Sequence, residues 1–303
     1  MRRIRIGTRG SRLALIQTEY VEKELKHRFA DVITERVIIH TEADKDRRTP
    51  LYEFKGTGVF AKELESALLE DRIDIAVHSA KDMSVNIPDK LTIAGALERE
   101  DVRDVLVYRK DIPKSLDDIK QEITIGTDSP RRKSQIEKLY PLIKCESIRG
   151  NVPTRIAKVK NGEYDGALLA VAGLKRLGLL EEEDLNYHYF SEEEILSAGG
   201  QGIIAIETRK DDDIVSYIDR ISDKTAFAEL MAEQRILKLL NAGCHEPIAV
   251  RAKVVGDDIT ITIVNAIMSA DNKAVCTEIK RSCKSGKQND WENIALAAAR
   301  EIR

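Results

Sequence analysis

The first two thirds of the chain alternate short apolar runs with longer segments in which apolar residues recur every three or four positions. Short apolar runs are typical of buried strands, and the longer spacing is typical of amphipathic helices. Strands that alternate with helices predict an α/β fold with largely parallel strands. Strands are predicted at 4–7, 37–39, 73–77, 105–107, 123–125 and 167–170, and helices at 11–29 and 59–70 and from about 129 and 152.

The helix expected over 11–29 has both a cap and an apolar face. Ser11 is suited to accept a hydrogen bond from the first turn, so we place the start of the helix there. The side chains near one face are Leu13, Ile16, Tyr20 and Leu25. Helical spacing predicts that this face is buried against the rest of the protein.

The pattern changes at about residue 225. A long helix to residue 241 is followed by three β-rich runs and a final helix over 291–302. This order predicts a separate α+β domain of about 80 residues, a size that folds on its own. The three β-rich runs lie at 248–255, 259–264 and 274–279.

The composition is that of a soluble globular protein. Of 303 residues, 42% are hydrophobic and 33% are charged. No apolar run approaches the ~18 residues that a membrane span needs. The first seven residues carry basic charge without an apolar signal core, so we expect a cytoplasmic protein. The net charge of −3 gives no reason to expect a nucleic-acid partner.

Cysteine and histidine positions argue against a metal site. The four cysteines, Cys145, Cys244, Cys276 and Cys283, form no CxxC pair, and the five histidines show no metal-ligand spacing. His245 beside Cys244 is one adjacent pair, which does not make a zinc site. We therefore expect no metal, and free thiols in a reducing compartment.

Arginines recur where helices are predicted to begin. Cations are disfavoured at helix N-termini, because the helix dipole there is already positive. Their repeated placement predicts that an anion binds at these ends, held by backbone N–H and guanidinium groups. The alternative is that the arginines pair with nearby Asp and Glu side chains on the surface. They are Arg9 before Ser11, Arg131 and Arg132 after Ser129-Pro130, and Arg149 and Arg155 on either side of Asn151.

Asp82 follows the strand predicted at 73–77. This position lies at the carboxyl edge of the sheet, where α/β proteins bind their ligands. His78 and Lys81 are close to Asp82 in sequence. A carboxylate flanked by cations stays ionised and is suited to stabilise a developing positive charge. A salt bridge within a loop is the alternative interpretation.

Cys244 lies between Gly243 and His245, just past the end of a predicted helix. Glycine there favours a left-handed turn and allows the backbone to approach a ligand closely. We expect the thiol to be reachable, with His245 favouring the thiolate. The alternative is an incidental cysteine in a turn. The other three cysteines lie in apolar or strand-like contexts and are expected to be inert.

Two glycine clusters match no nucleotide-binding motif. The segment Gly56-Thr57-Gly58 lacks the lysine and hydroxyl residue of a P-loop, and 199–202 is not a GxGxxG fingerprint. Hinge or close-approach roles are therefore expected for these glycines. The segment 41–58 around the first cluster is polar and without periodicity, which predicts a mobile loop.

Several ordered motifs together resemble the porphobilinogen deaminase family. The resemblance covers nearly the whole chain and implies two lobes related to periplasmic binding proteins, joined by two crossing segments, plus a third domain with the cofactor cysteine. It places domain 1 at 1–97 and 197–217, domain 2 at 98–196 and domain 3 at 218–303. The motifs are TRGSRLAL at 8–15, DIAVHSAKD at 74–82, IRGNVPTR at 148–155, NGEYD at 161–165, LAVAGLKRLG at 169–178, GQG at 200–202 and GCHEPI at 243–248.

The resemblance implies a transferase that deaminates and polymerises four porphobilinogen molecules into the linear tetrapyrrole hydroxymethylbilane, with release of ammonia. The primer is a dipyrromethane cofactor bound through a thioether at Cys244. Each porphobilinogen carries two carboxylates, so the growing chain is a polyanion that suits arginines. Loss of ammonia leaves a cationic azafulvene, which Asp82 stabilises while it accepts pyrrole N–H bonds.

The resemblance also assigns the remaining site residues and implies a monomer. The cofactor is expected to contact Cys244, Gly243, Thr127, Ser129, Arg131, Arg132 and Lys81. The substrate is expected to contact Arg9, Ser11, Arg149, Arg155, Arg176 and Gln201.

The chain departs from the family pattern in three places. Glu53 and Thr57 stand where lysines are usual, with Lys55 as a substitute, and 197–199 replaces a Pro-Ala-Val-like run. The family's usual Thr-Ser-Ser-Leu-Arg-Arg is replaced at 127–132 by TDSPRR. Asp128, at its second position, adds a negative charge beside the expected anion site. Two alternatives to the active enzyme follow: a ligand-binding module of the same bilobal fold, and a slow divergent paralogue.

Overall fold

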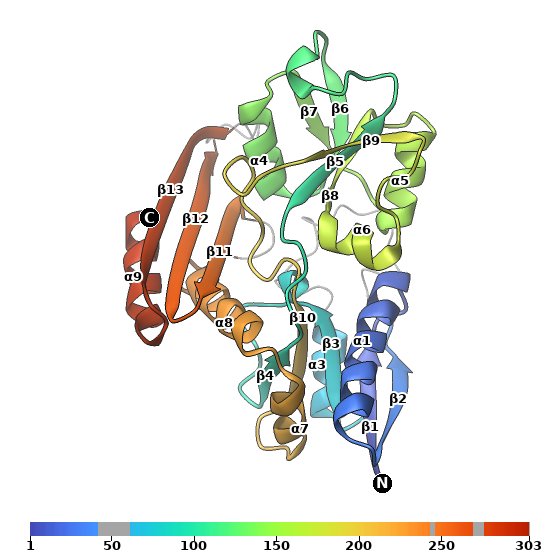
Figure 1. Cartoon of the computed structure of the whole chain (residues 1–303), viewed down its shortest axis with the longest axis vertical. Helices are drawn as coiled ribbons and strands as arrows, with labels where there is room; N and C mark the ends of the chain where they lie inside the picture. The colour runs from blue at the N-terminus through green and yellow to red at the C-terminus, as the bar shows by residue number, and fades with distance from the viewer. Residues whose placement is uncertain (42–60, 243–245, 269–275, 303) are drawn as a thin grey trace.

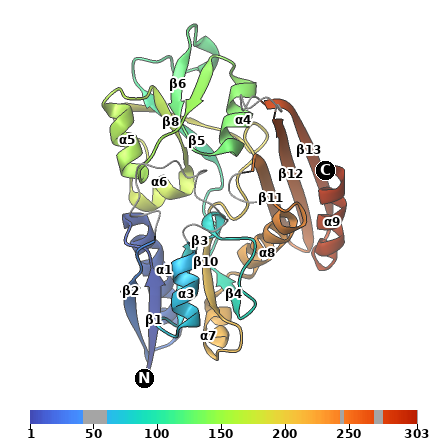
Figure 2. The same ribbon diagram turned by 180° about the vertical axis from the view of Figure 1, so that it is seen from behind.

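The structure is a computed structural model that describes residues 1–41, 61–242, 246–268 and 276–302. Within these residues the strands form two five-stranded sheets and one three-stranded sheet. Figures 1 and 2 show the five-stranded sheets as two lobes, one above the other, with the three-stranded sheet beside them. The predicted class, two α/β lobes and a smaller C-terminal α+β domain, is confirmed.

The first lobe is a sheet with helices on both faces. Its strand order is β2 (Val32–Ile38), β1 (Arg2–Thr8), β3 (Ile75–Ser79), β10 (Ile204–Arg209) and β4 (Leu91–Ala96). One face is covered by α1 (Arg12–Arg28) and α7 (Ile214–Ile221), whose Val21 and Ile218 pack with Ile4 of the sheet. The other face is covered by α3 (Lys62–Leu69) through Leu64 and Leu68. This burial of aliphatic side chains on both faces stabilises the lobe.

The second lobe repeats this plan. Its strand order is β7 (Ile143–Glu146), β6 (Ile123–Gly126), β8 (Gly166–Ala170), β5 (Asp104–Arg109) and β9 (Leu185–Tyr189). Helix α4 (Pro130–Leu139) packs on one face through Ile136. Helices α5 (Val152–Lys160) and α6 (Val171–Leu177) pack on the other face through Ile156 and Leu174. Short 3₁₀ helices lie at η2 (Ala80–Asp82), η3 (Leu116–Asp118) and, in the C-terminal domain, η4 (Gln288–Asp290).

The expectation of largely parallel strands is only half right. Strand β1 is parallel to β2 and β3, and β6 is parallel to β7 and β8. Strand β10 is antiparallel to both of its neighbours, and so is β5. Each of these two strands follows a segment that crosses from one lobe to the other, so it enters its sheet from the opposite end. Apolar patterning predicts that a strand exists and carries no information on its direction.

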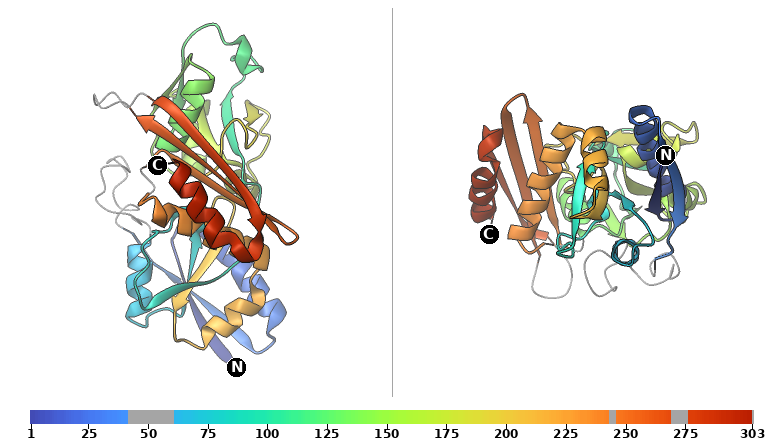
Figure 3. Two further views of the ribbon diagram at one scale, coloured as in Figure 1. Left: turned by 90° about the vertical axis from the view of Figure 1, so that its left-hand side faces the viewer. Right: turned by 90° about the horizontal axis from the view of Figure 1, so that it is seen from below.

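The C-terminal domain is an antiparallel meander with two helices on one face. Strands β11 (Ile248–Val255), β12 (Asp258–Met268) and β13 (Cys276–Lys287) pair in sequence order. Helices α8 (Lys224–Leu239) and α9 (Trp291–Ile302) share a core with this sheet that includes Ile236, Ile261 and Ala298. Figure 3 shows α9 on the side of the sheet that faces away from the lobes. The first β run and the last helix match their predicted limits.

Buried ion pairs attach α8 to both crossing segments. Arg99 of the first crossing donates to Glu229 at 3.0 Å and to Glu233 at 2.7 Å. Glu233 also accepts from the backbone N–H of Gly200 in the second crossing, at 2.6 Å. Arg251 of β11 adds a 2.9 Å bond to Glu229. The helix that precedes the predicted cofactor turn is therefore fixed to the connections between the lobes.

Candidate active site

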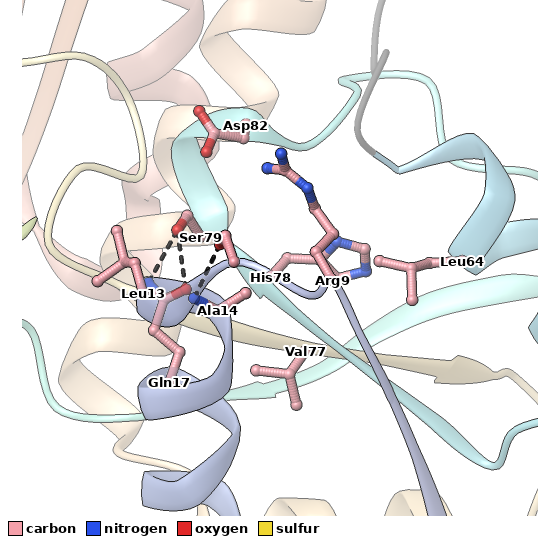
Figure 4. A pocket seen from close by; sticks show the side chains of 10 residues that line it. Arg9, Leu13, Ala14, Gln17, Leu64, Val77, His78, Ser79 and Asp82 are labelled. Atoms are coloured by element: carbon pink, nitrogen blue, oxygen red, sulfur yellow. Dashed lines mark hydrogen bonds between the residues drawn. The ribbon is translucent and has the colours of Figure 1, made fainter. Parts of the chain in front are cut away.

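A small pocket opens at the carboxyl ends of β1 and β3, with a volume of about 70 Å³. The two strands are adjacent and parallel, with Ile6 opposite Ile75, so the residues that follow them meet at one sheet edge. Arg9 follows β1, and η2 places Asp82 beyond the end of β3. Figure 4 shows the guanidinium of Arg9 and the carboxylate of Asp82 on the same side of this pocket. The predicted location of Asp82 at this edge is confirmed.

Helix α1 supplies the opposite wall of the pocket. The Ser11 side chain accepts from the N–H of Ala14 at 3.2 Å, so the predicted cap is confirmed. Gln17 and Ser79 exchange hydrogen bonds of 2.8 and 3.0 Å across the pocket (Figure 4). Sequence reasoning missed Gln17, although a polar residue on the helix face toward the sheet was a usable signal. Of the predicted apolar face, Leu25 is buried as expected, but Tyr20 is 40% exposed, and the buried face also carries Gln17 and Val21.

His78 lines the pocket and interacts with two acidic residues, Glu207 and Glu65. Its Nε2 lies 3.0 Å from Oε2 of Glu207, and both side chains are buried. Burial, together with the charge of Glu207, raises the pKa of Glu65 to about 7. The predicted group of His78, Lys81 and Asp82 is therefore divided, because His78 has its own acidic partner.

Lys81 lies where the two lobes meet. Its Nζ donates to Oε1 of Gln201 at 3.4 Å. Burial and the positive charge of Arg132 lower the pKa of Lys81 to about 8, against the opposing charge of Asp82. Because Arg132 belongs to the second lobe and Asp82 to the first, this environment brings together groups that are far apart in sequence.

Arg131 and Arg132, which lie at the start of α4, share the buried carboxylate of Asp104, the first residue of β5. Asp104 lies 2.7 Å from Nη1 of Arg131 and accepts from Nε and Nη2 of Arg132 at 3.1 and 2.7 Å. Burial opposes the charge of Asp104, but the two guanidinium groups hold the pKa of this carboxyl well below its usual range. Pairing with an acidic residue, the alternative weighed above, is thus correct for these two arginines, although the pair lies in the interior rather than on the surface. Because one carboxylate neutralises only one of the two guanidinium groups, a positive charge remains on this pair of arginines.

Arg155 of the second lobe interacts electrostatically with Asp82 of the first lobe. Its Nε donates to the carbonyl of Gly150 at 2.9 Å, and Nη2 lies 3.7 Å from Oδ2 of Asp128. Burial lowers the pKa of Arg155, Asp128 and Asp82 oppose this change, and the positive charges of Arg132 and Arg149 reinforce it. These interactions define the interlobe cluster, which consists of Lys81, Asp82, Arg131, Arg132, Arg149 and Arg155.

Helix caps explain how these side chains are presented. Ser129 accepts from the N–H of Arg132 at 3.4 Å, and its own N–H donates to the hydroxyl of Thr127 at 3.2 Å. Asn151 accepts from the N–H of Thr154 at 3.0 Å and so begins α5. The helices predicted from about residues 129 and 152 are confirmed, with Ser129 and Asn151 as their caps, and both helices present their first turns to the interlobe cluster.

Arg176 and Gln201 contact the crossing segments. Arg176 donates to the carbonyl of Gly202 at 2.7 Å. Gln201 is buried and donates to Asp104 at 2.9 Å and to the carbonyl of Val102 at 2.7 Å. Both residues thus have protein partners, and their predicted contacts with substrate stay a prediction.

The close-approach prediction for the second glycine cluster is confirmed. Gly200 and Gly202 have φ angles of +77° and +88°, which favour glycine. A Cβ on Gly200 would lie 2.8 Å from the backbone of Ala80 and Lys81, and one on Gly202 would lie 2.3 Å from the carbonyl oxygen of Glu100. The second crossing segment therefore packs directly against the turn that carries Asp82.

Some predicted residues lie outside the described residues: Gly243, Cys244, Glu53, Lys55, Thr57 and the first glycine cluster. The described chain runs through the end of α8 and resumes at residue 246, just before β11. Cys145 is buried, and burial raises the pKa of its thiol to about 12, as expected for an inert cysteine. Cys276 and Cys283 lie on β13, and Cys283 is exposed.

The described part of the chain holds neither a metal-binding group nor a membrane-spanning helix. No group of three or more His, Cys, Asp or Glu side chains there is arranged to hold a metal ion. No helix there is long and apolar enough to cross a lipid bilayer.

Fold and site together define a class of protein: two α/β lobes with a cationic site between them, and a third domain fixed to their connections. Residues 4–216 match the family model described as porphobilinogen deaminase, dipyromethane cofactor binding domain, and residues 227–303 match its C-terminal domain model. The chain belongs to the porphobilinogen deaminase family. It is therefore an enzyme of tetrapyrrole synthesis that acts on porphobilinogen and uses a dipyrromethane cofactor.

Two curated relatives match this chain over almost the whole length of both proteins. Porphobilinogen deaminase from Acetivibrio thermocellus is 40% identical over 300 residues, which cover 99% of this chain and 98% of the relative. The enzyme from Nitrobacter winogradskyi is 41% identical over 302 residues, which cover 98% of this chain and 92% of the relative.

Solved structures with a similar arrangement are more distant. A periplasmic VFT2 domain of Bordetella pertussis BvgS has a TM-score of 0.42 and 15% identity, covering 72% of this chain and 86% of that domain. A Salmonella typhimurium periplasmic binding protein described as specific for arginine has a TM-score of 0.43 and 13% identity, covering 75% of this chain and 94% of that protein.

Proposed function

We propose that this chain joins four porphobilinogen molecules, one at a time, to a dipyrromethane held through a thioether at Cys244, and releases hydroxymethylbilane. The observation that carries the assignment of the site is the interlobe cluster. It brings one first-lobe carboxylate, Asp82, into the electrostatic environment of second-lobe arginines such as Arg155. A polycarboxylate that loses ammonia needs both kinds of group, cations for its carboxylates and one anion for the charge that develops.

The donor set of the cluster fits the cofactor. The five basic residues, Lys81 among them, stand against three carboxylates, namely Asp82, Asp104 and Asp128. This leaves positive charge for a ligand built from two porphobilinogens, which has four carboxylates. The residues that we expect to hold it are Lys81, Thr127, Ser129, Arg131, Arg132, Gly243 and Cys244. When bound, the cofactor supplies a pyrrole ring with a free α-carbon as the nucleophile.

The incoming substrate is expected to lie nearer the first-lobe pocket. The guanidinium groups of Arg9 in this pocket and of arginines from the second lobe bind its acetate and propionate carboxylates in bidentate geometry. The small, partly enclosed pocket beside Asp82 orients the reacting ring and limits water. The residues that we expect to contact substrate are Arg9, Ser11, Arg149, Arg155, Arg176 and Gln201.

Asp82 is the proposed catalytic residue. The C–N bond of the substrate aminomethyl group breaks, the nitrogen leaves as ammonia, and the positive charge spreads over the pyrrole. A carboxylate fixed at a sheet edge stabilises that charge more in the transition state than in the ground state. The position of Asp82 in η2, braced by the Gly200 backbone, supports this role because it limits reorganisation of the carboxylate.

The wider organisation belongs to the same proposal. The membership of the three sheets supports the division into domains 1–97 with 197–217, 98–196 and 218–303, with the last boundary moved to the end of α7 because Ile218 packs in the first lobe. The described cysteines Cys145, Cys276 and Cys283 are free thiols, which supports a reducing, cytoplasmic location. We propose that the enzyme works there as a monomer without a nucleic-acid partner.

The test of this function is a single-turnover measurement with Asp82→Asn. We expect the step that adds porphobilinogen to slow about 10²–10³-fold, with little change in substrate affinity, because the lost interaction forms mainly in the transition state. Asp89→Asn, which changes an exposed carboxylate of the same lobe, is the control and should match wild type.

Three outcomes would overturn the proposal. A wild-type rate in Asp82→Asn would remove Asp82 from catalysis. A wild-type chain that binds porphobilinogen without consuming it would favour the ligand-binding module, and one that carries a loaded cofactor without steady product would favour the slow paralogue.

A further inference from the structure

Asp128 places a carboxylate of the chain itself beside a proposed substrate-binding arginine. It lies between β6 and the cap of α4, and its side chain is only 5% exposed. One oxygen, Oδ1, accepts from the hydroxyl of Ser147. The other, Oδ2, is buried without a hydrogen-bond donor among the described residues and lies 3.7 Å from Nη2 of Arg155.

This contact contributes charge rather than orientation. A separation of 3.7 Å exceeds a hydrogen bond, so Asp128 does not fix the direction of the Arg155 guanidinium. That direction is set by the backbone, because Nε of Arg155 donates to the carbonyl of Gly150 at 2.9 Å. The ion pair still acts at close range, since the two side chains are 5% and 16% exposed and water screens them little.

We infer that Asp128 is an affinity-determining residue that competes with substrate carboxylates for Arg155 and so weakens porphobilinogen binding. The inference rests on the proposed function, which places Arg155 in the substrate site. A substrate carboxylate that approaches Arg155 meets the negative charge of Asp128 a few ångströms away. The attraction between Arg155 and a substrate carboxylate is therefore weaker than Arg155 alone would give. Asp128 has this effect although it touches no reacting atom.

A purely structural role makes a different prediction. Asp128 precedes the first turn of α4, where a negative charge favours the helix dipole, and Ser147 ties it to the segment before α5. If this were its whole function, removing the charge would lower the melting temperature and leave the Michaelis constant unchanged. The kinetic constants therefore separate the two roles.

The experiment compares Asp128→Asn and Asp128→Ser with wild type in steady-state assays with porphobilinogen. We expect KM to fall about three- to tenfold in both variants, the range for one partly screened charge, while kcat changes less than twofold. The fall should persist as salt is raised, because dissolved ions screen two mostly buried side chains little. Ser147→Ala is the matched control, since it removes the hydrogen bond to Oδ1 and keeps the charge, and its KM should stay at the wild-type value.

A double-mutant cycle tests whether the effect passes through Arg155. In an Arg155→Gln background, Asp128→Asn should lower KM less than it does in the wild-type background. An unchanged or increased KM in Asp128→Asn and Asp128→Ser, or an equal fall of KM in the Arg155→Gln background, would overturn the inference while the enzyme still elongates its cofactor. A wild-type chain that adds no porphobilinogen by intact mass would overturn the proposed function itself, and the inference with it.

Discussion

Asp104 at the start of β5 and Arg132 in the first turn of α4 form a buried pair with two hydrogen bonds to one oxygen, at 3.1 and 2.7 Å. Arg131 lies 2.7 Å from the other oxygen, and Gln201 of the second crossing segment donates at 2.9 Å. One carboxylate thus links a strand, a helix and a lobe connection. It also fixes the two arginines that we expect to hold the cofactor.

Asp104→Asn should therefore destabilise the protein strongly. The change leaves two buried guanidinium groups without a countercharge, which typically costs about 3–5 kcal/mol. Urea unfolding at neutral pH measures the loss. The control is Asp111→Asn, whose carboxylate is 67% exposed and paired to Arg109, and its effect should stay below about 1 kcal/mol. Equal stabilities of the two variants would show that the buried carboxylate is not required.

A pair of glycine substitutions separates backbone strain from close approach. Gly178 and Gly200 have similar positive φ angles of +66° and +77°. A Cβ on Gly178 meets nothing within 4 Å, whereas one on Gly200 would press on the backbone of Ala80 and Lys81. Gly178→Ala should cost about 1 kcal/mol and leave kcat unchanged. Gly200→Ala should cost more and lower kcat, because the turn that carries Asp82 must move. Identical melting temperatures and kcat values for the two variants would contradict this account.

The pKa of Lys81, about 8, predicts a pH dependence of substrate binding. As pH rises through 8, the folded enzyme loses one positive charge from the interlobe cluster, so KM for porphobilinogen should increase between pH 7 and 9. Lys81→Arg keeps its charge over this range, and its KM should be nearly flat. A KM that rises equally in both enzymes would assign the titration to another group.

The same shift has a consequence for stability. Between pH 8 and 10.5 the unfolded chain retains a proton on Lys81 that the folded protein has released. The contribution of Lys81 to the free energy of unfolding therefore rises with pH across this window. Comparing the pH dependence of unfolding in wild type and Lys81→Arg isolates this contribution.

Local patterns predicted most of the secondary structure because they depend on neighbouring residues. The caps at Ser11, Ser129 and Asn151 follow from side-chain oxygens three positions before a free backbone N–H. Strand β13 continues to Lys287, well past its predicted end at residue 279. The apolar pattern missed this extension because the later residues of the strand are mostly polar. Pairing with β12 makes this segment a strand, and an apolar pattern cannot reveal such pairing.

The candidate site was predictable residue by residue, but not as a set of partners. Sequence reasoning placed Asp82 and the arginines at strand and helix ends. It did not foresee that Arg132 shares Asp104 with Arg131, or that Asp128 lies beside Arg155. These pairs join residues from distant parts of the second lobe that its strand order brings together, and no local spacing encodes them.

The most direct test of the central claim is the intact mass of the purified wild-type protein beside Cys244→Ser. We predict a wild-type mass excess equal to two porphobilinogen units less two ammonias, absent from the variant, and further regular increments when porphobilinogen is added. A wild-type mass that equals the bare chain and stays there after incubation with porphobilinogen would contradict it.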